Sequence, residues 1–318
     1  MRPARLVAAC VVVASSASTT GAQAPIVVTG QVMRVTAAGP APVPGASVTL
    51  HRIGVSSAAP LDSTIADGSG HYRFRVAAPD TNAMYLPTTR HGGLAYFAAP
   101  IRVGDPVGEG IIEVFDTTST DVPIRITGRH VVVSAPDADG ERAIVEVYEV
   151  SNDTVLTRLG TRDRPAFVAR LPRGATKVRA TQGDFTGDAV VTVPGGVGVV
   201  APVAPGIRQL ALSYALPPSA FPLDITLTDS SAVVEVLLEE PGGRATGDGL
   251  EALGAVTSEG RSFVRFLGRD LPLGNRIQVQ VPAAVGGSVA RWGWLAVLAL
   301  AALGAIGWSM RRHPAAAA

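Results

Sequence analysis

The sequence predicts an all-β protein built from tandem β-sandwich modules. Apolar and polar residues alternate with a period of two in many short segments along the middle of the chain, which is typical of strands with one buried face. Turn signals such as Asp67-Gly68 and Pro194-Gly195-Gly196 separate these segments. The 35 glycines and 24 prolines favour many turns and few long helices.

Residues 1–24 have the organisation of a secretory signal peptide. Arg2 and Arg5 supply positive charge, residues 6–14 are apolar, and Ala22-Gln23-Ala24 is a small-x-small cleavage site. Cys10 is the only cysteine and lies inside this signal, so we expect a mature chain without a disulfide, a thiolate nucleophile or a cysteine metal ligand.

Residues 292–310 predict one transmembrane helix, joined to the β-modules by a linker at 286–291. The span has no charged residue, and its nineteen residues would extend roughly 28 Å as a helix. Aromatic residues lie at its two ends and basic residues follow it, as interfacial anchors do: Trp292, Trp294, Trp308, Arg311 and Arg312. The positive-inside rule places the tail 311–318 in the cytoplasm and the bulk of the chain outside it, which is the periplasmic side of the inner membrane in a Gram-negative cell.

Two alternatives to a permanent membrane anchor stay open. A buried core helix is one, although such helices rarely run this long without a polar face. The other is a transient helix, since Gly286-Gly287-Ser288, the apolar span and the arginine pair together resemble the C-terminal sorting tails that some bacteria cleave after export.

The alternating segments assign an inward and an outward face to each expected strand. Tyr72, Phe74 and Val76 should be buried, and the same pattern occurs at 46–51, 210–214, 223–228 and 276–281. In 210–214 the inward residues are the leucines and the tyrosine, whereas Ala211 and Ser213 should face outward. Residues 233–238 are almost continuously apolar, as in a central strand covered on both faces.

The first module, residues 25–100, contains the motifs Pro42–Leu50 (PVPGASVTL) and Thr64–Phe74 (TIADGSGHYRF). Together they resemble the carboxypeptidase regulatory-like domain, a small transthyretin-like β-sandwich. The resemblance implies a fold and no activity. Members often adjoin a zinc carboxypeptidase domain, but no histidine here has a glutamate three residues later, as its ligand pair requires. Within the module, residues 67–70 should form a tight hairpin connection that brings Tyr72 into the core.

The remaining exported residues are expected to form a second sandwich at 101–206 and a third β-module at 207–285. The patterns leave open whether these are separate or fused. Expected strands lie at 111–115, 130–134, 143–150, 155–159, 166–171, 208–218, 223–227, 233–238, 263–267 and 277–281.

No catalytic, cofactor or metal site is predicted. His51, His71 and His91 fall on outward faces or in a turn, so surface histidines explain them better than a zinc site. The chain has no nucleophile elbow and no phosphate-binding or dinucleotide-binding loop.

Two charged clusters also favour ordinary surface structure. Asp137, Asp139 and Glu141 fail the calcium register, because its twelfth position is Tyr148, so an exposed acidic hairpin is favoured. Five arginines at 158, 162, 164, 170 and 173 are expected on a solvated hairpin face. Segment 25–285 holds 22 Lys and Arg against 26 Asp and Glu, which argues against nucleic acid as a partner.

These features predict a non-catalytic, membrane-anchored envelope protein that presents β-sandwich modules for structural or protein-interaction roles. The expected partners are the membrane, through the C-terminal helix, and envelope proteins. The alternative is carbohydrate binding by the first module, which requires exposed aromatic rings. With Tyr72 and Phe74 expected in the core, the candidates for ligand contact are Tyr85, Tyr96 and Phe97.

Overall fold

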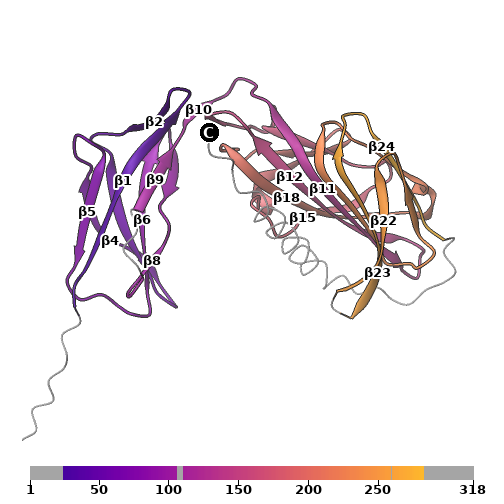
Figure 1. Cartoon of the computed structure of the whole chain (residues 1–318), viewed down its shortest axis with the longest axis horizontal. Helices are drawn as coiled ribbons and strands as arrows, with labels where there is room; N and C mark the ends of the chain where they lie inside the picture. Colours follow the sequence, from indigo (N-terminus) through magenta and orange to yellow (C-terminus); the bar gives the residue numbers. More distant parts are fainter. Residues whose placement is uncertain (1–23, 106–109, 259, 283–318) are drawn as a thin grey trace, which may run out of the picture. The chain divides into compact units, whose positions relative to one another are not determined.

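The computed structural model describes residues 24–105, 110–258 and 260–282, and within them the protein is nearly all-β, as predicted (Figure 1). These residues form two compact units: unit 1 contains 24–35 and 39–114, and unit 2 contains 36–38 and 115–282. The predicted signal up to residue 23 and the predicted linker, membrane helix and tail lie outside the described residues. Within the described ranges, no helix is both long enough and apolar enough to cross a membrane.

Unit 1 consists of two sheets. The first has the order β2 (Gly39–Pro42), β1 (Ile26–Thr36) and β5 (His71–Val76), with β9 (Gly110–Val114) paired in parallel to β1. The second has the order β4 (Ala58–Ile65), β3 (Ser47–Ile53), β6 (Met84–His91) and β7 (Leu94–Phe97), with β8 (Ile101–Arg102) paired to β6.

The alternation predicted for residues 71–76 is confirmed. Tyr72, Phe74 and Val76 are buried, whereas the residues between them are exposed. The Tyr72 hydroxyl donates a 2.5 Å hydrogen bond to the carbonyl oxygen of Gly110, which ties β5 to β9 over the strand β1 that lies between them. Position 30 of β1 requires glycine, because a Cβ atom there would overlap both that carbonyl oxygen and the Tyr72 hydroxyl.

Residues 67–70 form a tight turn, but the prediction that this turn closes a hairpin was wrong. The Asp67 carboxylate accepts hydrogen bonds from the backbone N–H groups of Ser69 (2.8 Å) and His71 (2.9 Å), and Gly70 has a φ of +78°. Strand β4 before the turn pairs with β3, whereas β5 after it pairs with β1 in the other sheet. The turn therefore carries the chain between sheets, because local turn chemistry does not specify which strand becomes the partner.

The first unit also extends beyond the boundary expected at residue 100. Strand β9 supplies residues 110–114 to the sheet of β1, and Ile112 and Val114 are fully buried. These residues had been placed in the second module.

Unit 2 is organised around one seven-stranded sheet. Its order is β15 (Thr176–Ala180), β18 (Gly206–Leu216), β12 (Arg142–Asn152), β11 (Ile124–Pro136), β20 (Ser231–Leu238), β23 (Arg261–Leu271) and β22 (Leu250–Ser258). Two three-stranded sheets accompany it, one ordered β14 (Phe167–Arg170), β17 (Gly196–Val199) and β16 (Val190–Val193), the other β19 (Leu223–Thr226), β24 (Arg276–Gln280) and β21 (Arg244–Thr246). Short strands β10 (Asp116–Thr118) and β13 (Leu156–Arg158) pair with each other, and 3₁₀ turns occupy Gly187–Ala189 and Pro218–Ala220.

The large sheet contains strands from both 101–206 and 207–285, the two ranges that the sequence patterns left open as separate or fused modules. Strand β11, from the expected second module, pairs in parallel with β20, from the expected third, in register from Gly128–Val233 to Val133–Leu238. The described residues after 114 therefore belong to one fused unit. Strand β20 lies inside this sheet, as its continuous apolar run predicted.

Both small sheets pack on the same face of the large sheet, which we call the inner face. Val131, Ile144, Tyr214, Val234 and Phe266 of the large sheet form one core cluster with residues of β19, β21 and β24. Tyr148, Val150, Leu210 and Leu212 form a second cluster with residues of β14, β16 and β17. These large-sheet residues occupy alternate positions of their strands, so the positions between them point to the opposite, outer face.

One prediction about β18 was wrong. Leu210, Leu212 and Tyr214 are buried as expected, but Ala211 and Ser213, which should have faced outward, are buried as well. Both faces of this strand are therefore buried, which the alternation of leucine with small residues did not reveal.

Candidate functional sites

Of the three rings expected to contact a ligand, the structure exposes one. Tyr85 is 1% exposed, Tyr96 is 9% exposed and Phe97 is 58% exposed. The Tyr85 hydroxyl accepts a 2.6 Å hydrogen bond from the backbone N–H of Asp80. The expectation was therefore wrong for Tyr85 and Tyr96, whose rings belong to the interior of unit 1. Phe97 is exposed although its neighbour Tyr96 is buried, because adjacent residues of a strand point to opposite faces of the sheet.

Phe97 lies on a groove that the outward face of the β4-β3-β6-β7 sheet forms. The groove has a volume of about 490 Å³, and its lining includes Thr49, His51, Thr88 and Arg90. These side chains offer hydroxyl, imidazole and guanidinium groups beside one open ring. Such a set can hydrogen-bond a polyhydroxy ligand, and the sequence identified only Phe97 of its members.

The edge strand β4 is the most exposed strand of unit 1. Seven of its eight residues are exposed, and Leu61 (44%) and Ile65 (64%) present apolar side chains to solvent. Its first half is protected against further pairing, because it contains Pro60 and its register with β3 shifts between Leu50 and His51. The second half, from Leu61 to Ile65, has no such protection apart from Asp62.

The histidines of unit 1 do not converge. His71 Nδ1 lies 3.8 Å from Asp67 Oδ1, and hydrogen bonds from the backbone N–H groups of His71 and Ser69 hold the pKa of Asp67 below its usual value. Across the described residues, no group of three or more His, Cys, Asp or Glu side chains is arranged to hold a metal ion.

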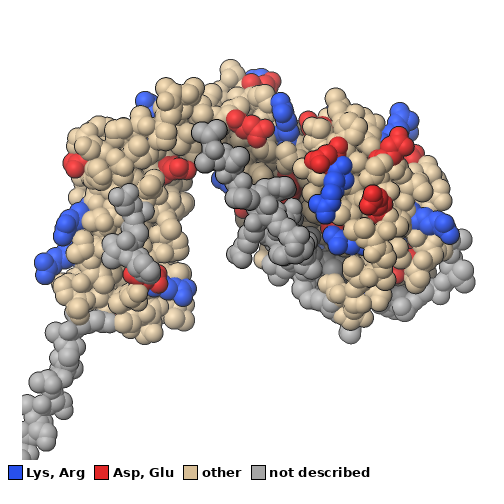
Figure 2. All heavy atoms as spheres, in the orientation of Figure 1, with Lys and Arg blue, Asp and Glu red and all other residues tan. Residues whose placement is uncertain are grey.

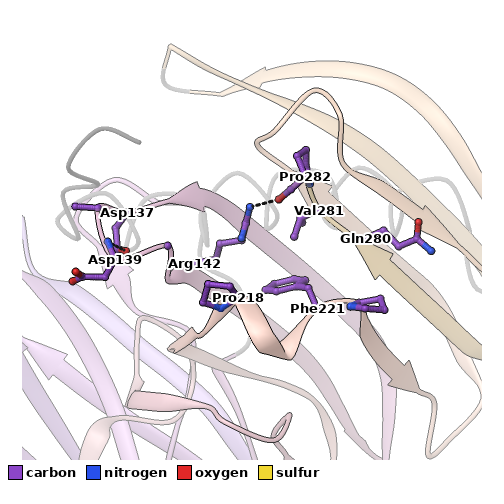
Figure 3. Close-up of a pocket in the computed structure, with 11 residues that line it drawn as sticks. Asp137, Asp139, Arg142, Pro218, Phe221, Gln280, Val281 and Pro282 are labelled. Atoms are coloured by element: carbon purple, nitrogen blue, oxygen red, sulfur yellow. Dashed lines mark hydrogen bonds between the residues drawn. The ribbon is translucent and has the colours of Figure 1, made fainter. Parts of the chain in front are cut away.

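A cavity of about 680 Å³ in unit 2 surrounds Arg142 (Figure 3). Arg142 is fully buried at the start of β12. Its Nε donates to Glu240 Oε2 (2.8 Å), its Nη2 donates to the carbonyl oxygen of Pro282 (2.9 Å), and its guanidinium lies 5.3 Å from the centre of the Phe221 ring. Arg142 therefore anchors the chain just after β24.

Asp137 and Asp139 reach this cavity from the turn between β11 and β12 (Figure 3). The Asp137 carboxylate accepts hydrogen bonds from the backbone N–H groups of Asp139 (3.0 Å) and Glu141 (2.9 Å), and Glu141 pairs with Lys177 at 2.6 Å. Residues 137–141 thus form the turn between β11 and β12, with the half-buried Asp137 carboxylate committed to the turn itself and Asp139 exposed.

A buried charged network occupies the inner face of the large sheet. Arg129 Nε donates to Glu146 Oε1 at 2.6 Å, and the Tyr214 hydroxyl donates to Glu146 Oε2 at 2.8 Å. Burial alone would lower the pKa of Arg129, but the adjacent Glu146 outweighs burial and raises it. Burial and then Glu146 raise the pKa values of Tyr148 and Tyr214. Arg129 therefore stays charged and Tyr148 and Tyr214 stay neutral across the physiological range, which suits a structural network rather than proton transfer.

A second charged network lies on the outer face of the same sheet. His130 Nδ1 is 2.9 Å from Glu235 Oε2, Arg265 Nε donates to Glu235 Oε1 at 2.5 Å, and Glu149 Oε1 lies 3.9 Å from His130 Nε2. Burial raises the pKa of Glu149 despite the nearby His130. For Glu235, burial acts in the same direction, but the His130 hydrogen bond and Arg265 prevail and lower its pKa. The sequence signal for this network was one glutamate inside the apolar run 233–238.

The arginine cluster is only partly the solvated surface that was expected. Arg158 is buried, and its guanidinium donates to the carbonyl oxygens of Ser119 (2.6 Å) and Leu159 (2.7 Å) and to Asp121 Oδ1 (2.8 Å). Arg164 is exposed and donates to Asp121 Oδ2 at 2.9 Å. These contacts, Arg164 first, lower the pKa of Asp121.

Acidic and basic side chains are interspersed over the face that Figure 2 shows, and its described residues form no basic stripe. No family model matches this chain, and the search of curated proteins found no match.

Proposed function

We propose that this protein is a non-catalytic envelope protein, anchored by residues 292–310, whose exported β-units bind a partner protein. The exposed half of edge strand β4 carries this proposal. An open edge presents unpaired backbone N–H and C=O groups, and an extended partner segment can add to it as a further strand. Leu61 and Ile65 would give such a partner apolar contacts.

Site-specific photocrosslinking in the native membrane tests this docking surface. A photoreactive residue is placed in the full chain at position 61 or 65, and at Val55 as a control, because Val55 is 97% exposed in unit 1 outside any strand. We expect the same partner to be captured from positions 61 and 65 and not from 55. Leu61→Lys with Ile65→Lys should abolish capture without unfolding the unit, whereas Val55→Lys should not. Equal capture from all three positions would refute an edge-specific partner.

The membrane anchor is tested separately by reporter fusions at the C-terminus. A cytoplasm-only reporter at Ala318 should be active and an export-dependent phosphatase should not, because Arg311 and Arg312 favour a cytoplasmic tail. The opposite result would refute the orientation, and a mature form ending near Gly286 would support a cleaved sorting tail.

Carbohydrate binding is the second candidate, and the groove beside Phe97 favours it. The burial of Tyr85 and Tyr96 weakens it, because stacking on a chain of sugar rings usually uses more than one open aromatic ring. Titration of the full chain with envelope glycans decides between the two functions. Micromolar binding that Phe97→Ala removes, and Val55→Ala leaves intact, would establish the glycan function; its absence would leave the edge-strand proposal.

A further inference from the structure

The groove on the outward face of the β4-β3-β6-β7 sheet carries positive charge without a balancing carboxylate. Arg90 and His51 both line it, and none of its described lining residues is acidic. Arg90 is exposed, and within the described residues its guanidinium has no hydrogen bond or ion pair. The groove therefore offers a free cation to a ligand.

Strand pairing places this guanidinium next to the open aromatic ring. Thr88 of β6 is directly opposite Phe97 of β7, and Arg90 is opposite Ala95. Arg90 and Phe97 are therefore diagonal neighbours on one face of the sheet, with Cβ atoms about 7–8 Å apart. Ala95 has only a methyl group, so the space between the ring and the guanidinium stays open.

A row of hydroxyl groups continues from Phe97 across the sheet. Thr49 of β3 lies opposite Thr88 on one side and Ser63 of β4 on the other. Thr88 Oγ1 donates to the Thr49 carbonyl oxygen (3.3 Å), and the Thr49 and Ser63 hydroxyls share a hydrogen bond of 3.1 Å. Since a hydroxyl has one proton and two lone pairs, these groups keep free acceptor positions. The row suits a ligand that brings its own hydroxyl donors.

The free cation, the single open ring and the hydroxyl row together favour an acidic sugar. With Tyr85 and Tyr96 buried, Phe97 alone gives a neutral sugar chain little stacking surface. A carboxylate gains a charge-assisted, bidentate contact with arginine that a neutral group lacks. A hexuronate carries such a carboxylate at the edge of its pyranose ring and hydroxyls around the rest of the ring. One sugar unit can therefore use all three features at once.

From these observations we infer that the groove of unit 1 binds an acidic oligosaccharide whose sugar rings carry carboxylates. Arg90 binds the carboxylate, Phe97 stacks on the ring, and Thr49 and Thr88 accept hydrogen bonds from its hydroxyls. The inference rests on the glycan-binding candidate and names the charge class of the glycan. It goes beyond partner binding at the edge of β4.

Calorimetric titration of the full chain with matched probes tests the charge requirement. The probes are oligogalacturonate and oligomannuronate, each beside its own methyl ester, which keeps the rings and removes the charge. We expect micromolar binding of at least one acid and at least tenfold weaker binding of its ester. Added salt should weaken binding of the acid more than binding of the ester, because ions screen an exposed charge pair. Equal affinity for acid and ester would overturn the inference, while the glycan candidate would stand.

Variants assign the contacts. Arg90→Gln should reduce the affinity for the acid at least tenfold, to that for the ester, whereas Phe97→Ala should weaken binding of both. Arg52→Gln is the matched control, because it removes an exposed arginine of β3 that is absent from the described groove lining. It should change neither affinity. If Arg90→Gln binds the acid as tightly as Arg52→Gln does, the inference is wrong.

An acidic protein segment is the competing occupant, and oligoglutamate is its probe. It supplies carboxylates without sugar hydroxyls, so it should bind at least tenfold more weakly than the acidic oligosaccharide. Tighter binding of oligoglutamate that Arg90→Gln removes would overturn the inference in favour of a peptide. If no oligosaccharide binds, the inference and the glycan candidate fail together. The edge-strand proposal is then still decided by crosslinking from positions 61 and 65, which lie outside the described groove lining.

Discussion

Removing the charge of Glu146 should destabilise unit 2 far more than any surface substitution. Glu146 is fully buried and accepts hydrogen bonds from Arg129 (2.6 Å) and Tyr214 (2.8 Å). With an effective dielectric constant of about 20, unit charges at that N–O distance attract by about 6 kcal/mol before desolvation is counted. Glu146→Gln leaves the Arg129 guanidinium buried without a counter-charge, and breaking a buried pair in this way typically costs about 3–5 kcal/mol.

Removing the whole network should cost much less. In the triple variant Arg129→Met, Glu146→Leu and Tyr214→Phe, no buried charge or hydroxyl of this network is left without its partner. Replacing a complete buried ion pair with apolar residues of similar volume is often neutral or stabilising, by about 1–4 kcal/mol. We therefore expect the triple variant to be at least 2 kcal/mol more stable than Glu146→Gln alone.

Hydrogen exchange measured on peptides of β12 and β18 gives the opening free energy of unit 2, and peptides of unit 1 serve as an internal reference. At about 1.4 kcal/mol per factor of ten, Glu146→Gln should accelerate exchange roughly 100-fold to 4,000-fold in unit 2 only. The exposed Glu251→Gln is the matched control and should change stability by less than about 0.5 kcal/mol. If Glu146→Gln behaves like Glu251→Gln, or the triple variant is as unstable as the single one, the reasoning is wrong.

Three further predictions concern the two units. Gly30→Ala should destabilise unit 1 by about 2 kcal/mol or more, because a Cβ atom there overlaps the Gly110 carbonyl oxygen; thermal unfolding followed in unit 1 peptides checks this, and an unchanged midpoint would contradict it. Tyr72→Phe should cost about 1–2 kcal/mol by removing the hydrogen bond to that carbonyl group, with no effect on unit 2 in the same experiment. The pKa of Asp121 is lowered in the folded chain, so its contribution to stability is present above its unfolded value of about 3.9 and is lost as the pH falls through the folded pKa. Asp121→Asn should therefore lower the melting temperature of unit 2 at pH 7, and the difference from the unchanged protein should shrink below pH 4; a difference independent of pH would rule out the carboxylate as its source.

Much of the local structure followed from short-range pattern. The alternation in 71–76 determined which side chains of β5 are buried, because successive strand residues must point to opposite faces. The turn at His91-Gly92-Gly93 closes the hairpin of β6 and β7, and both glycines adopt positive φ values (+55° and +82°) that favour glycine. The apolar run 233–238 predicted a central strand, and β20 is one.

Which strands pair with one another could not be predicted from the sequence. Pairing of β1 with β9, and of β11 with β20, joins residues about 80 and 105 positions apart, and no local signal identifies which distant strand completes a sheet. Domain boundaries depend on these pairings, which is why residues 110–114 were assigned to the wrong module.

For the candidate sites, too, the sequence revealed residue types, whereas the exposure or burial of each side chain depended on the tertiary structure. Phe97 was identified because an aromatic residue in a strand is visible in the sequence, but its exposure, and the burial of Tyr85 and Tyr96, depend on which face of each strand meets the other sheet. The burial of Arg158 and His130 was not predicted, because a polar or charged side chain carries no sequence mark of the partner that permits its burial.

By itself, the sequence determined that the described chain is nearly all-β, where most of its strands and turns lie, and that a charge-free segment of nineteen residues follows them. Periodicity, turn residues and composition are local properties, so they can be identified without a structure. Only the tertiary structure decided that the described residues after 114 form one unit, that edge strand β4 is open, and that inner strands of the large sheet such as β12 and β18 are buried on both faces. Each of these depends on contacts between segments far apart in the chain, and such contacts are set by the packing of the whole fold.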